Sequence, residues 1–276
     1  MLVCSNGKFI EESELLLDVQ TNRAFRYGDG FFETIRFENN RITLFKYHLQ
    51  RIIASNNLFK FEPSTFSFSN IETLITQTFQ LNSIESGIAR VTFFRSGRGR
   101  YTPLQNEMQF LIEVAEQSFG SYFSLLNEVG LSERTVLHVH SFSHLKSLNA
   151  LPYVFAAMEA KEKDWNECLI PNTKNEIAEG TWSSLVWMED NELYTPPLSS
   201  GCVSSTMKEA LKDFLQQKGR DLTEKECSLS NLQHAQEVWL LNATRGIQAV
   251  SRFQDKIYSH SKALEMASEL NDFLSL

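Results

Sequence analysis

Two short pairs of turn-forming residues constrain the fold of this chain most strongly. Asn6-Gly7 lies between the apolar stretches 2–4 and 9–10, and Asn39-Asn40 separates the β-forming stretch 31–37 from 41–44. Such pairs accept the backbone of a tight turn, so each predicts a β-hairpin with two antiparallel strands. The chain therefore does not begin as a strict alternation of strands and helices, which would favour a parallel sheet.

Helical periodicity follows each group of expected strands. Apolar residues recur at helical spacing in 45–58, where Phe45, Leu49, Ile52 and Ile53 share a face, and again in 71–81. We expect three further helices, at 150–163, 206–217 and 262–274. Further strands are expected at 88–94, 108–114, 134–140, 168–170, 185–188, 193–194, 237–241 and 247–252.

These elements predict an α+β fold of two domains, with mixed, largely antiparallel sheets, flanking helices and an interdomain cleft. Periodicity weakens at 118–130, and we place the crossover between domains there. The expected domains are a smaller N-terminal one, 1–120, and a larger C-terminal one, 121–276. Asn149 is expected to cap the helix that begins near residue 150.

Composition excludes several classes of function. The 276 residues carry a net charge of −8, which argues against nucleic acid or an anionic membrane as the main partner. No apolar run approaches the roughly 18 residues that cross a bilayer. The four cysteines are scattered without a CxxC or CxxH spacing, so we expect no metal site and reduced thiols in a cytoplasmic protein.

Lys146 is the first candidate for chemistry. It lies among apolar residues and is expected to follow a strand and precede a helix; its apolar neighbours are Phe142, Leu145, Leu148 and Leu151. Desolvation favours a neutral amine, which is a nucleophile and can form a Schiff base with pyridoxal phosphate. The alternative is a lysine whose stem lies along apolar surface while its amine reaches water.

Three other stretches carry candidates of the same kind. Glu179, in the stretch 177–187, could hold a proton on a pyridine nitrogen, or be an ordinary carboxylate at a strand end. The hydroxyl-rich turn before Thr206 could offer backbone N–H groups to a phosphate, or be a plain helix cap. Arg51 could bind a phosphate with its guanidinium, or be a solvated surface residue.

Taken in order, these stretches resemble one family, the class IV or fold type IV pyridoxal-phosphate enzymes. The family includes branched-chain and D-amino-acid aminotransferases and 4-amino-4-deoxychorismate lyases. The matching stretches are YGDGFFETIR at 27–36, HLQR at 48–51, KSLN at 146–149, EGTWSSL at 179–185, LYTPPLSSGCVSSTMKEAL at 193–211 and NATRGIQAV at 242–250. The resemblance covers about 6 to 252, and the ordered set is far more specific than any single motif.

The resemblance implies roles for particular residues. Lys146 matches the lysine that binds pyridoxal 5'-phosphate covalently and transfers protons, Glu179 the partner of its ring nitrogen, and Arg51 a ligand of its phosphate. The other cofactor-binding positions are Ser205, Thr206, Met207 and Ala243. Expected substrate-binding residues are Tyr27, Phe32 and Arg36, on a strand that faces the substrate in relatives, and Arg95 and Arg98 in the loop RSGRGRYTP. That loop could equally be a solvated basic hairpin tip.

Three departures from the family pattern bear on the cofactor site. Ser205-Thr206-Met207-Lys208 replaces a Gly-Ile-Thr-Arg-like turn, and Ala243 stands where many relatives have threonine or serine. Thr244 is adjacent to Ala243 but would point elsewhere if this segment were a strand. Many aminotransferases also carry a tyrosine shortly after the lysine, at the position of Ala150.

The resemblance implies a PLP-dependent lyase or aminotransferase that acts on a small amino substrate, and a homodimer. The stretches 27–34 and 242–250 and the absence of tyrosine at position 150 favour 4-amino-4-deoxychorismate lyase-like β-elimination, which gives pyruvate and 4-aminobenzoate. The alternative is a branched-chain or D-amino-acid aminotransferase, and a second alternative is a relative that binds without catalysis. The motifs do not identify the substrate or its stereochemistry. They also leave open whether the altered turn before the helix at 206–217 weakens cofactor binding.

Overall fold

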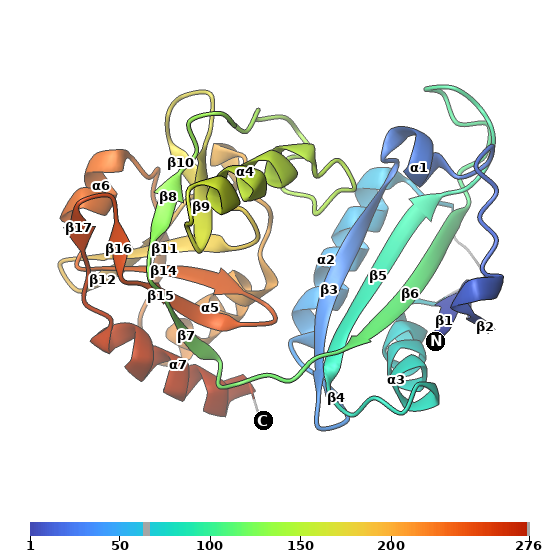
Figure 1. Ribbon diagram of the computed structural model, residues 1–276, viewed down its shortest axis with the longest axis horizontal. Helices are drawn as coiled ribbons and strands as arrows, with labels where there is room; N and C mark the ends of the chain where they lie inside the picture. Colours follow the sequence, from blue (N-terminus) through green and yellow to red (C-terminus); the bar gives the residue numbers. More distant parts are fainter. Residues whose placement is uncertain (63–66, 275–276) are drawn as a thin grey trace. The chain divides into compact units, whose positions relative to one another are not determined.

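The computed structural model describes residues 1–62 and 67–274, and the chain forms two compact units (Figure 1). The first unit consists of Met1–Phe119 and Leu145–Asn149, and the second of Gly120–His144 and Ala150–Leu276. Residues 145–149, which the sequence assigned to the second domain, thus group with the first unit. That 1–120 and 121–276 are separate domains remains a prediction.

The first unit is built on one antiparallel sheet with the strand order β2-β1-β6-β5-β3-β4. Its strands are β1 (Leu2–Ser5), β2 (Lys8–Glu11), β3 (Gly30–Glu38), β4 (Arg41–Ile42), β5 (Gly87–Arg95) and β6 (Met108–Glu116). Its helices are α1 (Arg23–Tyr27), α2 (Phe45–Phe59) and α3 (Ile71–Leu81), with short 3-10 turns at Glu12–Glu14 and Phe68–Asn70. Both predicted hairpins are present, and all four turn residues have positive φ angles, as a tight two-residue turn requires.

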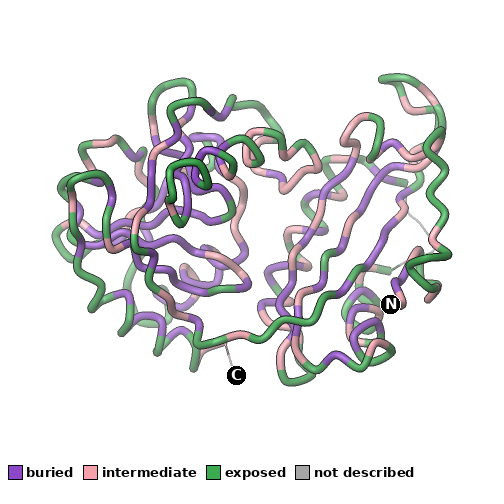
Figure 2. The backbone as a smooth tube through the Cα atoms, in the orientation of Figure 1, coloured by how far each residue is buried: buried purple, intermediate pink, exposed green. Residues whose placement is uncertain are grey.

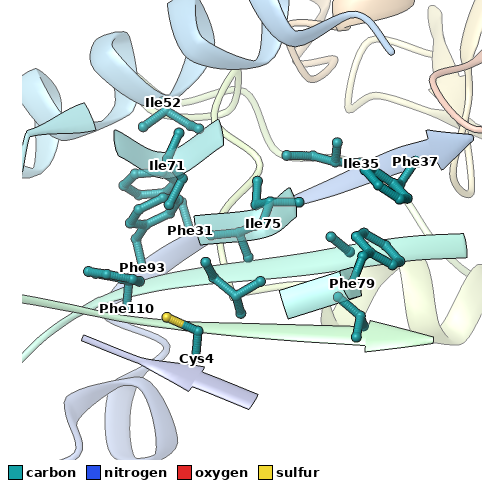
Figure 3. Packing of buried hydrophobic residues seen from close by; sticks show 14 of the residues in the cluster. Cys4, Phe31, Ile35, Phe37, Ile52, Ile71, Ile75, Phe79, Phe93 and Phe110 are labelled. Carbon is teal, nitrogen blue, oxygen red and sulfur yellow. The ribbon is translucent and has the colours of Figure 1, made fainter. Parts of the chain in front are cut away.

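Strand β3 divides its side chains between two faces. Phe31, Ile35 and Phe37 point into the hydrophobic core, where α3 contributes Ile75 and Phe79 (Figure 3). The rings of Phe37 and Phe79 stack with their centroids 4.1 Å apart. This alternation places the intervening side chains of β3 on the opposite face of the sheet. Helix α2 departs from expectation in one respect, because Ile53 is 43% exposed instead of buried.

The second unit contains two sheets, with the orders β10-β9-β8-β16-β17 and β13-β12-β11-β14-β15-β7. Its strands are β7 (Phe123–Leu126), β8 (Val129–Leu131), β9 (Glu167–Pro171), β10 (Ile177–Gly180), β11 (Ser184–Glu189), β12 (Glu192–Thr195), β13 (Leu222–Glu224), β14 (Glu237–Asn242), β15 (Gly246–Val250), β16 (Arg252–Phe253) and β17 (Lys256–Ile257). Its helices are α4 (Leu151–Glu162), α5 (Thr206–Gln217), α6 (Leu229–His234) and α7 (Ser261–Leu274), with a 3-10 turn at Leu198–Ser200.

Antiparallel and parallel pairs are mixed in both sheets of the second unit. Strand β11 lies antiparallel to β12 and β14, whereas β15 pairs with β7 in parallel and β8 pairs with β9 in parallel. The central strands β11 and β14 are buried along nearly their whole length, and α7 alternates between buried and exposed positions (Figure 2). The predicted α+β fold class with mixed sheets is therefore confirmed.

Two local predictions are wrong. The segment 134–140 contains no β-strand, and its one bridge joins Leu137 to Asn172. Asn149 does not cap α4: Ala150 occupies the N-cap position, and the Asn149 side chain donates to the Gly28 carbonyl at 3.2 Å. Within the described ranges, 1–62 and 67–274, no helix is long and apolar enough to span a membrane.

Candidate active site

Lys146 lies in an extended segment that runs beside β3 in the first unit. The Lys146 carbonyl accepts a hydrogen bond from Phe32 N–H at 3.0 Å, and Leu148 N–H donates to the Gly30 carbonyl at 3.0 Å. The lysine amine lies 4.6 Å from the centroid of the Phe32 ring. Backbone pairing thus fixes where the Lys146 side chain begins, and the Phe32 ring gives its amine an aromatic face.

The apolar cover expected around Lys146 is only partly present. Leu145 is buried, and Lys146 itself is half-buried. Phe142 and Leu151, however, are 48% and 63% exposed. The segment between 132 and 150 is irregular, so Lys146 does not follow a strand as expected, although α4 does begin soon after it.

A buried ionic cluster occupies the core side of β3. Glu33 Oε1 accepts from Arg51 Nε at 2.8 Å. Glu33 Oε2 accepts from Arg51 Nη2 at 2.5 Å and lies 2.7 Å from His48 Nδ1. Burial acts to raise the pKa of Glu33, but Arg51 and His48 outweigh it and lower that pKa to about 2. Burial lowers the pKa of His48, and the charge of Lys146 acts in the same direction. Arg51 is therefore not the solvated surface residue of the alternative interpretation, since it is tied to a buried carboxylate.

The opposite face of β3 carries Phe32 and Arg36. Arg36 donates to Glu38 at 2.5 Å and 3.1 Å, and its guanidinium lies over the Phe119 ring. Arg90, which pairs with Thr34 across β3 and β5, lies on the same face, with its guanidinium carbon 3.9 Å from the Phe32 ring centroid. This face therefore presents the Arg90 guanidinium beside the aromatic ring that contacts the Lys146 amine. It also carries the buried Arg36, which is paired with Glu38.

The sequence placed Tyr27 on the same strand as Phe32 and Arg36, but Tyr27 lies outside β3. It ends the short helix α1, and its hydroxyl lies 3.5 Å from the Gly99 carbonyl. Its ring centroid is 5.8 Å from that of Tyr101. Tyr27 thus contacts the arginine-rich loop between β5 and β6, and this is where its predicted substrate role would have to be exercised.

The arginine-rich loop is held by charged residues beneath it. Arg23 donates to Asp29 at 2.7 Å and to the Arg100 carbonyl at 2.8 Å. Arg95 donates to Asp29 at 3.0 Å, to Asn106 at 2.6 Å and to the Phe59 carbonyl at 2.8 Å. These bonds occupy the Arg95 guanidinium and favour a role in shaping the loop, so substrate binding by Arg95 stays a prediction. Arg98 is exposed on the loop and keeps its predicted role as a hypothesis.

Glu179 is the central carboxylate of the second unit. It lies on β10 and is 4% exposed. One of its oxygens accepts from the Tyr153 hydroxyl at 2.6 Å, and the other accepts from Val203 N–H at 3.0 Å. Both donors stabilise the ionised form of a buried acid and fix the plane of the carboxylate.

The N-terminus of α5 follows Val203 closely. Ser205 is the N-cap: its hydroxyl accepts from Lys208 N–H at 3.2 Å and from the Ser184 hydroxyl at 2.9 Å. Among the residues that the structure describes, the N–H groups of Thr206 and Met207 donate to no acceptor. Free N–H groups at the start of a helix favour an anion such as phosphate.

The segment around Ala243 is a turn between β14 and β15, so the condition placed on Thr244 does not hold. Thr244 is buried, and both its N–H and its hydroxyl donate to the Asn242 side chain, at 2.9 Å and 2.7 Å. Asn242 donates in turn to the Trp182 carbonyl at 2.8 Å. The turn is thereby tied to the residues that follow Glu179.

A second buried carboxylate, Glu167 on β9, supports the same loop. It accepts from Trp182 N–H at 3.1 Å and from the Ser183 hydroxyl at 2.8 Å. A Cβ atom at Gly180 would lie 2.3 Å from a Glu167 oxygen, so the loop needs glycine there. Burial raises the pKa of Glu167 to about 7, although these two donors act in the opposite direction.

The predicted residues thus fall into two clusters, one within each unit. The first contains Lys146, Phe32 and Arg51; the second contains Glu179 and the start of α5. The sequence interpretation missed Glu33, His48, Arg90, Tyr153 and Glu167. A signal existed for Glu33, because an acid at a core-facing position of an alternating strand needs a buried partner. Tyr153 lies three residues after position 150, about one helical turn from the position at which many aminotransferases carry a tyrosine.

Curated proteins similar to this chain carry several activities in their names. An aminodeoxychorismate lyase of Vibrio harveyi is 24% identical over 83% of this chain and 85% of the relative. A putative branched-chain-amino-acid aminotransferase of Methanocaldococcus jannaschii is 22% identical over 99% and 94%. A D-alanine aminotransferase of Bacillus licheniformis is 24% identical over 91% and 88%.

Solved structures share the fold. A branched-chain aminotransferase of Thermoproteus uzoniensis with norvaline superposes with a TM-score of 0.87, 18% identity and coverage of 99% of this chain and 94% of the other. The PLP-bound form of a hypothetical aminotransferase from Mycobacterium tuberculosis gives a TM-score of 0.81, with 19% identity and coverage of 99% and 98%. The family model described as amino-transferase class IV matches residues 30–253. With most of its length matched, the chain belongs to the amino-transferase class IV family and is an enzyme of that PLP-dependent group.

Proposed function

We propose that this protein binds pyridoxal 5'-phosphate through residues of both clusters. Lys146 would hold the cofactor covalently, Glu179 would contact its ring nitrogen, and the N–H groups of Thr206 and Met207 would bind its phosphate. Arg51 would add a charged phosphate ligand. The bonds between Arg51 and Glu33 would then orient the Arg51 guanidinium. They would not fully neutralise its positive charge, because the negative charge of Glu33 is shared with His48.

The observation that carries this proposal is the short connection from Glu179 to α5. Glu179 accepts from Val203 N–H, and only Ser204 and Ser205 separate Val203 from the unpaired N–H groups. A buried carboxylate and unpaired N–H groups at the start of a helix therefore lie close together along the chain. A ligand that carries a protonated ring nitrogen and a phosphate satisfies both, and the altered Ser-Thr-Met-Lys turn keeps the backbone donors.

Each residue then has a defined task. The bound cofactor supplies an electron sink for the bond broken next to the substrate amine. Lys146 would remove the proton from the substrate carbon that bears the amine, and Phe32 would limit where the Lys146 amine can move. Glu179 holds a proton at the ring nitrogen. Arg90, on the face of β3 that carries Phe32, would supply a cation for a substrate carboxylate. Arg36, on the same face and paired with Glu38, keeps its predicted substrate role as a hypothesis.

The reaction we propose is a lyase-like β-elimination on 4-amino-4-deoxychorismate, which gives pyruvate and 4-aminobenzoate. After Lys146 removes the proton, the leaving group departs from the adjacent carbon. Two arginines on one face suit a substrate with more than one carboxylate, and a similar relative is named aminodeoxychorismate lyase. Transamination of a branched-chain or D-amino acid is the second candidate, which similar relatives with those names favour.

Borohydride trapping tests the cofactor first. Purified protein is mixed with pyridoxal phosphate, its visible absorbance is measured, and the protein is reduced, digested and mapped. We expect the adduct on Lys146, its loss in K146A, and its retention in K163A, which changes an exposed lysine of the second unit. An adduct elsewhere, or turnover retained by K146A, would contradict the proposal. The absence of both an absorbance band and an adduct would favour a binding protein without catalysis.

A separate, unreduced sample of the protein with pyridoxal phosphate is then assayed for its reaction. Pyruvate and 4-aminobenzoate released in equal amounts from 4-amino-4-deoxychorismate would support the lyase. Exchange of amino groups between a D- or branched-chain amino acid and a 2-oxo acid, with no 4-aminobenzoate released from 4-amino-4-deoxychorismate, would favour the aminotransferase. We also propose a cytoplasmic location and a homodimer; all four cysteines are free and buried, which fits a reducing compartment.

A further inference from the structure

Tyr153 makes a contact for which neither the family pattern nor the proposed reaction gives a reason. It lies in the first turn of α4, half-buried, and packs against the small core that includes Ala156 and Ala178. Its hydroxyl donates to Glu179 at 2.6 Å. This is a short, charge-assisted hydrogen bond, the stronger kind of protein hydrogen bond.

The two donors to Glu179 are of different kinds. Val203 N–H is part of the backbone and is fixed by the segment before α5. The Tyr153 hydroxyl is a side-chain donor, and it can be removed without changing the backbone. Burial and the charge of Glu179 both raise the pKa of Tyr153, so the phenol stays protonated and remains a donor throughout the working pH range.

When a buried carboxylate lies opposite a pyridine nitrogen, the proton between them can reside on either group. Burial favours a neutral acid, which would leave the ring nitrogen unprotonated and a poor electron sink. Each donor to the carboxylate lowers its affinity for the proton and moves the balance toward a charged acid and a protonated ring. The Tyr153 hydroxyl is placed to have this effect.

We propose that Tyr153 is a positioning residue that keeps Glu179 ionised and correctly oriented toward the ring nitrogen of the cofactor. This inference rests on the proposed function. It also gives a physical meaning to a departure in the sequence: the tyrosine missing at position 150 is replaced by one a helical turn later, which acts on the acid.

The test compares Y153F with Y258F. Both changes remove one hydroxyl from a tyrosine that donates a hydrogen bond inside the second unit, and Tyr258 donates to the Leu232 carbonyl at 2.8 Å, in a different core cluster from Tyr153. Each protein is loaded with pyridoxal phosphate that carries nitrogen-15 in its ring. We expect the ring-nitrogen NMR signal of Y153F to move toward the unprotonated position, while Y258F matches the wild type.

Cofactor affinity gives a second readout. A hydrogen bond to a charged group corresponds to a loss of about tenfold or more in affinity, and we expect a loss of that order in Y153F only. In the E179Q background the effect of Y153F should vanish, because the charge that Tyr153 supports is absent. An unchanged ring signal in Y153F, or an equal loss of affinity in both backgrounds, would overturn the proposal.

Two further outcomes remain decisive. If the wild type binds no pyridoxal phosphate, the proposed function and this inference both fail; if it binds and Y153F behaves as wild type, only the inference fails. Should Y153F not fold, the wild type labelled with carbon-13 at tyrosine Cζ is compared with E179Q. One tyrosine signal should shift in E179Q, and no shift would show that the bond does not exist in solution.

Discussion

Two buried glutamates show how the surroundings of a single residue decide its charge. Glu33 is fully buried beside Arg51 and His48, whereas Glu167 is fully buried among neutral donors. The pKa of Glu33 falls to about 2 and that of Glu167 rises to about 7, although burial acts in the same direction on both. The free energy of unfolding should therefore respond to pH in opposite ways at these two positions.

For Glu33 we expect E33Q to reduce the free energy of unfolding by about 3–5 kcal/mol at pH 7, because Arg51 keeps its charge in a largely buried place. Since the folded pKa of Glu33 is lowered, its stabilisation is present above pH 4.5 and is lost as pH falls toward 2. Urea unfolding between pH 2 and 7 measures both effects. E162Q is the control, because both partners of the Glu162–Arg134 pair are exposed and the pair should contribute little to stability. Equal losses in the two variants would contradict this prediction.

For Glu167 the sign is reversed. Its pKa is raised in the folded state, so its contribution is fully present below pH 4.5 and is lost as pH rises through about 7. We expect E167Q, which keeps the shape of the side chain, to flatten the decline of unfolding free energy between these values. The difference from wild type should reach about 2–4 kcal/mol by pH 8, as the displaced pKa implies. Parallel pH profiles for E167Q and wild type would exclude the effect.

At the scale of elements, the extended segment that carries Lys146 depends on a glycine in β3. A Cβ atom at Gly30 would lie 2.3 Å from the Phe93 carbonyl oxygen and 2.9 Å from a Leu148 methyl carbon. We expect G30A to push the segment that carries Lys146 and Leu148 away from β3. The Leu148 amide should then exchange its hydrogen faster, and less cofactor should be trapped on Lys146. G120A is the control, because nothing lies within 4 Å of a Cβ there. Unchanged protection at Leu148 in G30A would contradict this view.

Elements whose partners lie nearby in sequence could be predicted. The two hairpins were marked by their turn residues, and the periodicity of α3 and α5 gave their bounds to the residue. The strand predicted at 134–140 failed for a physical reason. No described strand pairs with this segment, and its Val136 and Val139 are 43% and 45% exposed. Alternation indicates a strand only where a partner edge is available.

Elements that depend on distant partners were missed. Strands β7 and β8 pair in parallel with β15 and β16, more than 100 residues away, and their short lengths carry little pattern of their own. The candidate site shows the same division. Lys146 and Glu179 could be named from local motifs, whereas the contact of Tyr153 with Glu179 depends on how α4 packs on β9, the strand paired with β10. The helix cap predicted at Asn149 failed because that side chain bonds to Gly28 instead.

At the scale of the whole molecule, one face of α4 is unusually apolar for a surface. Leu151, Val154, Phe155 and Met158 recur at helical spacing and are 63%, 50%, 53% and 52% exposed. A stripe of this kind commonly marks a protein–protein interface. We expect this face to be covered by a second copy of the chain in the predicted homodimer.

The prediction is tested with F155E, measured by sedimentation equilibrium. Wild type should be a dimer, and F155E should dissociate because a charge cannot be buried unpaired at the centre of an apolar face. L264E is the control, since Leu264 on α7 is 53% exposed and lies outside the stripe. A dimer that survives F155E would place the interface elsewhere.

Residues 145–149 belong to the first unit although they follow part of the second unit in the sequence, and this order has a consequence for folding during synthesis. On the ribosome, residues 1–119 emerge long before the segment that pairs with β3 at Gly30 and Phe32. Until then that stretch of β3 keeps a carbonyl and an N–H group without their native partners, and an open strand edge can pair with other chains. The nascent N-terminal half should therefore need protection until residue 149 has been synthesised, and the same short segment that delivers the reactive lysine also completes the sheet.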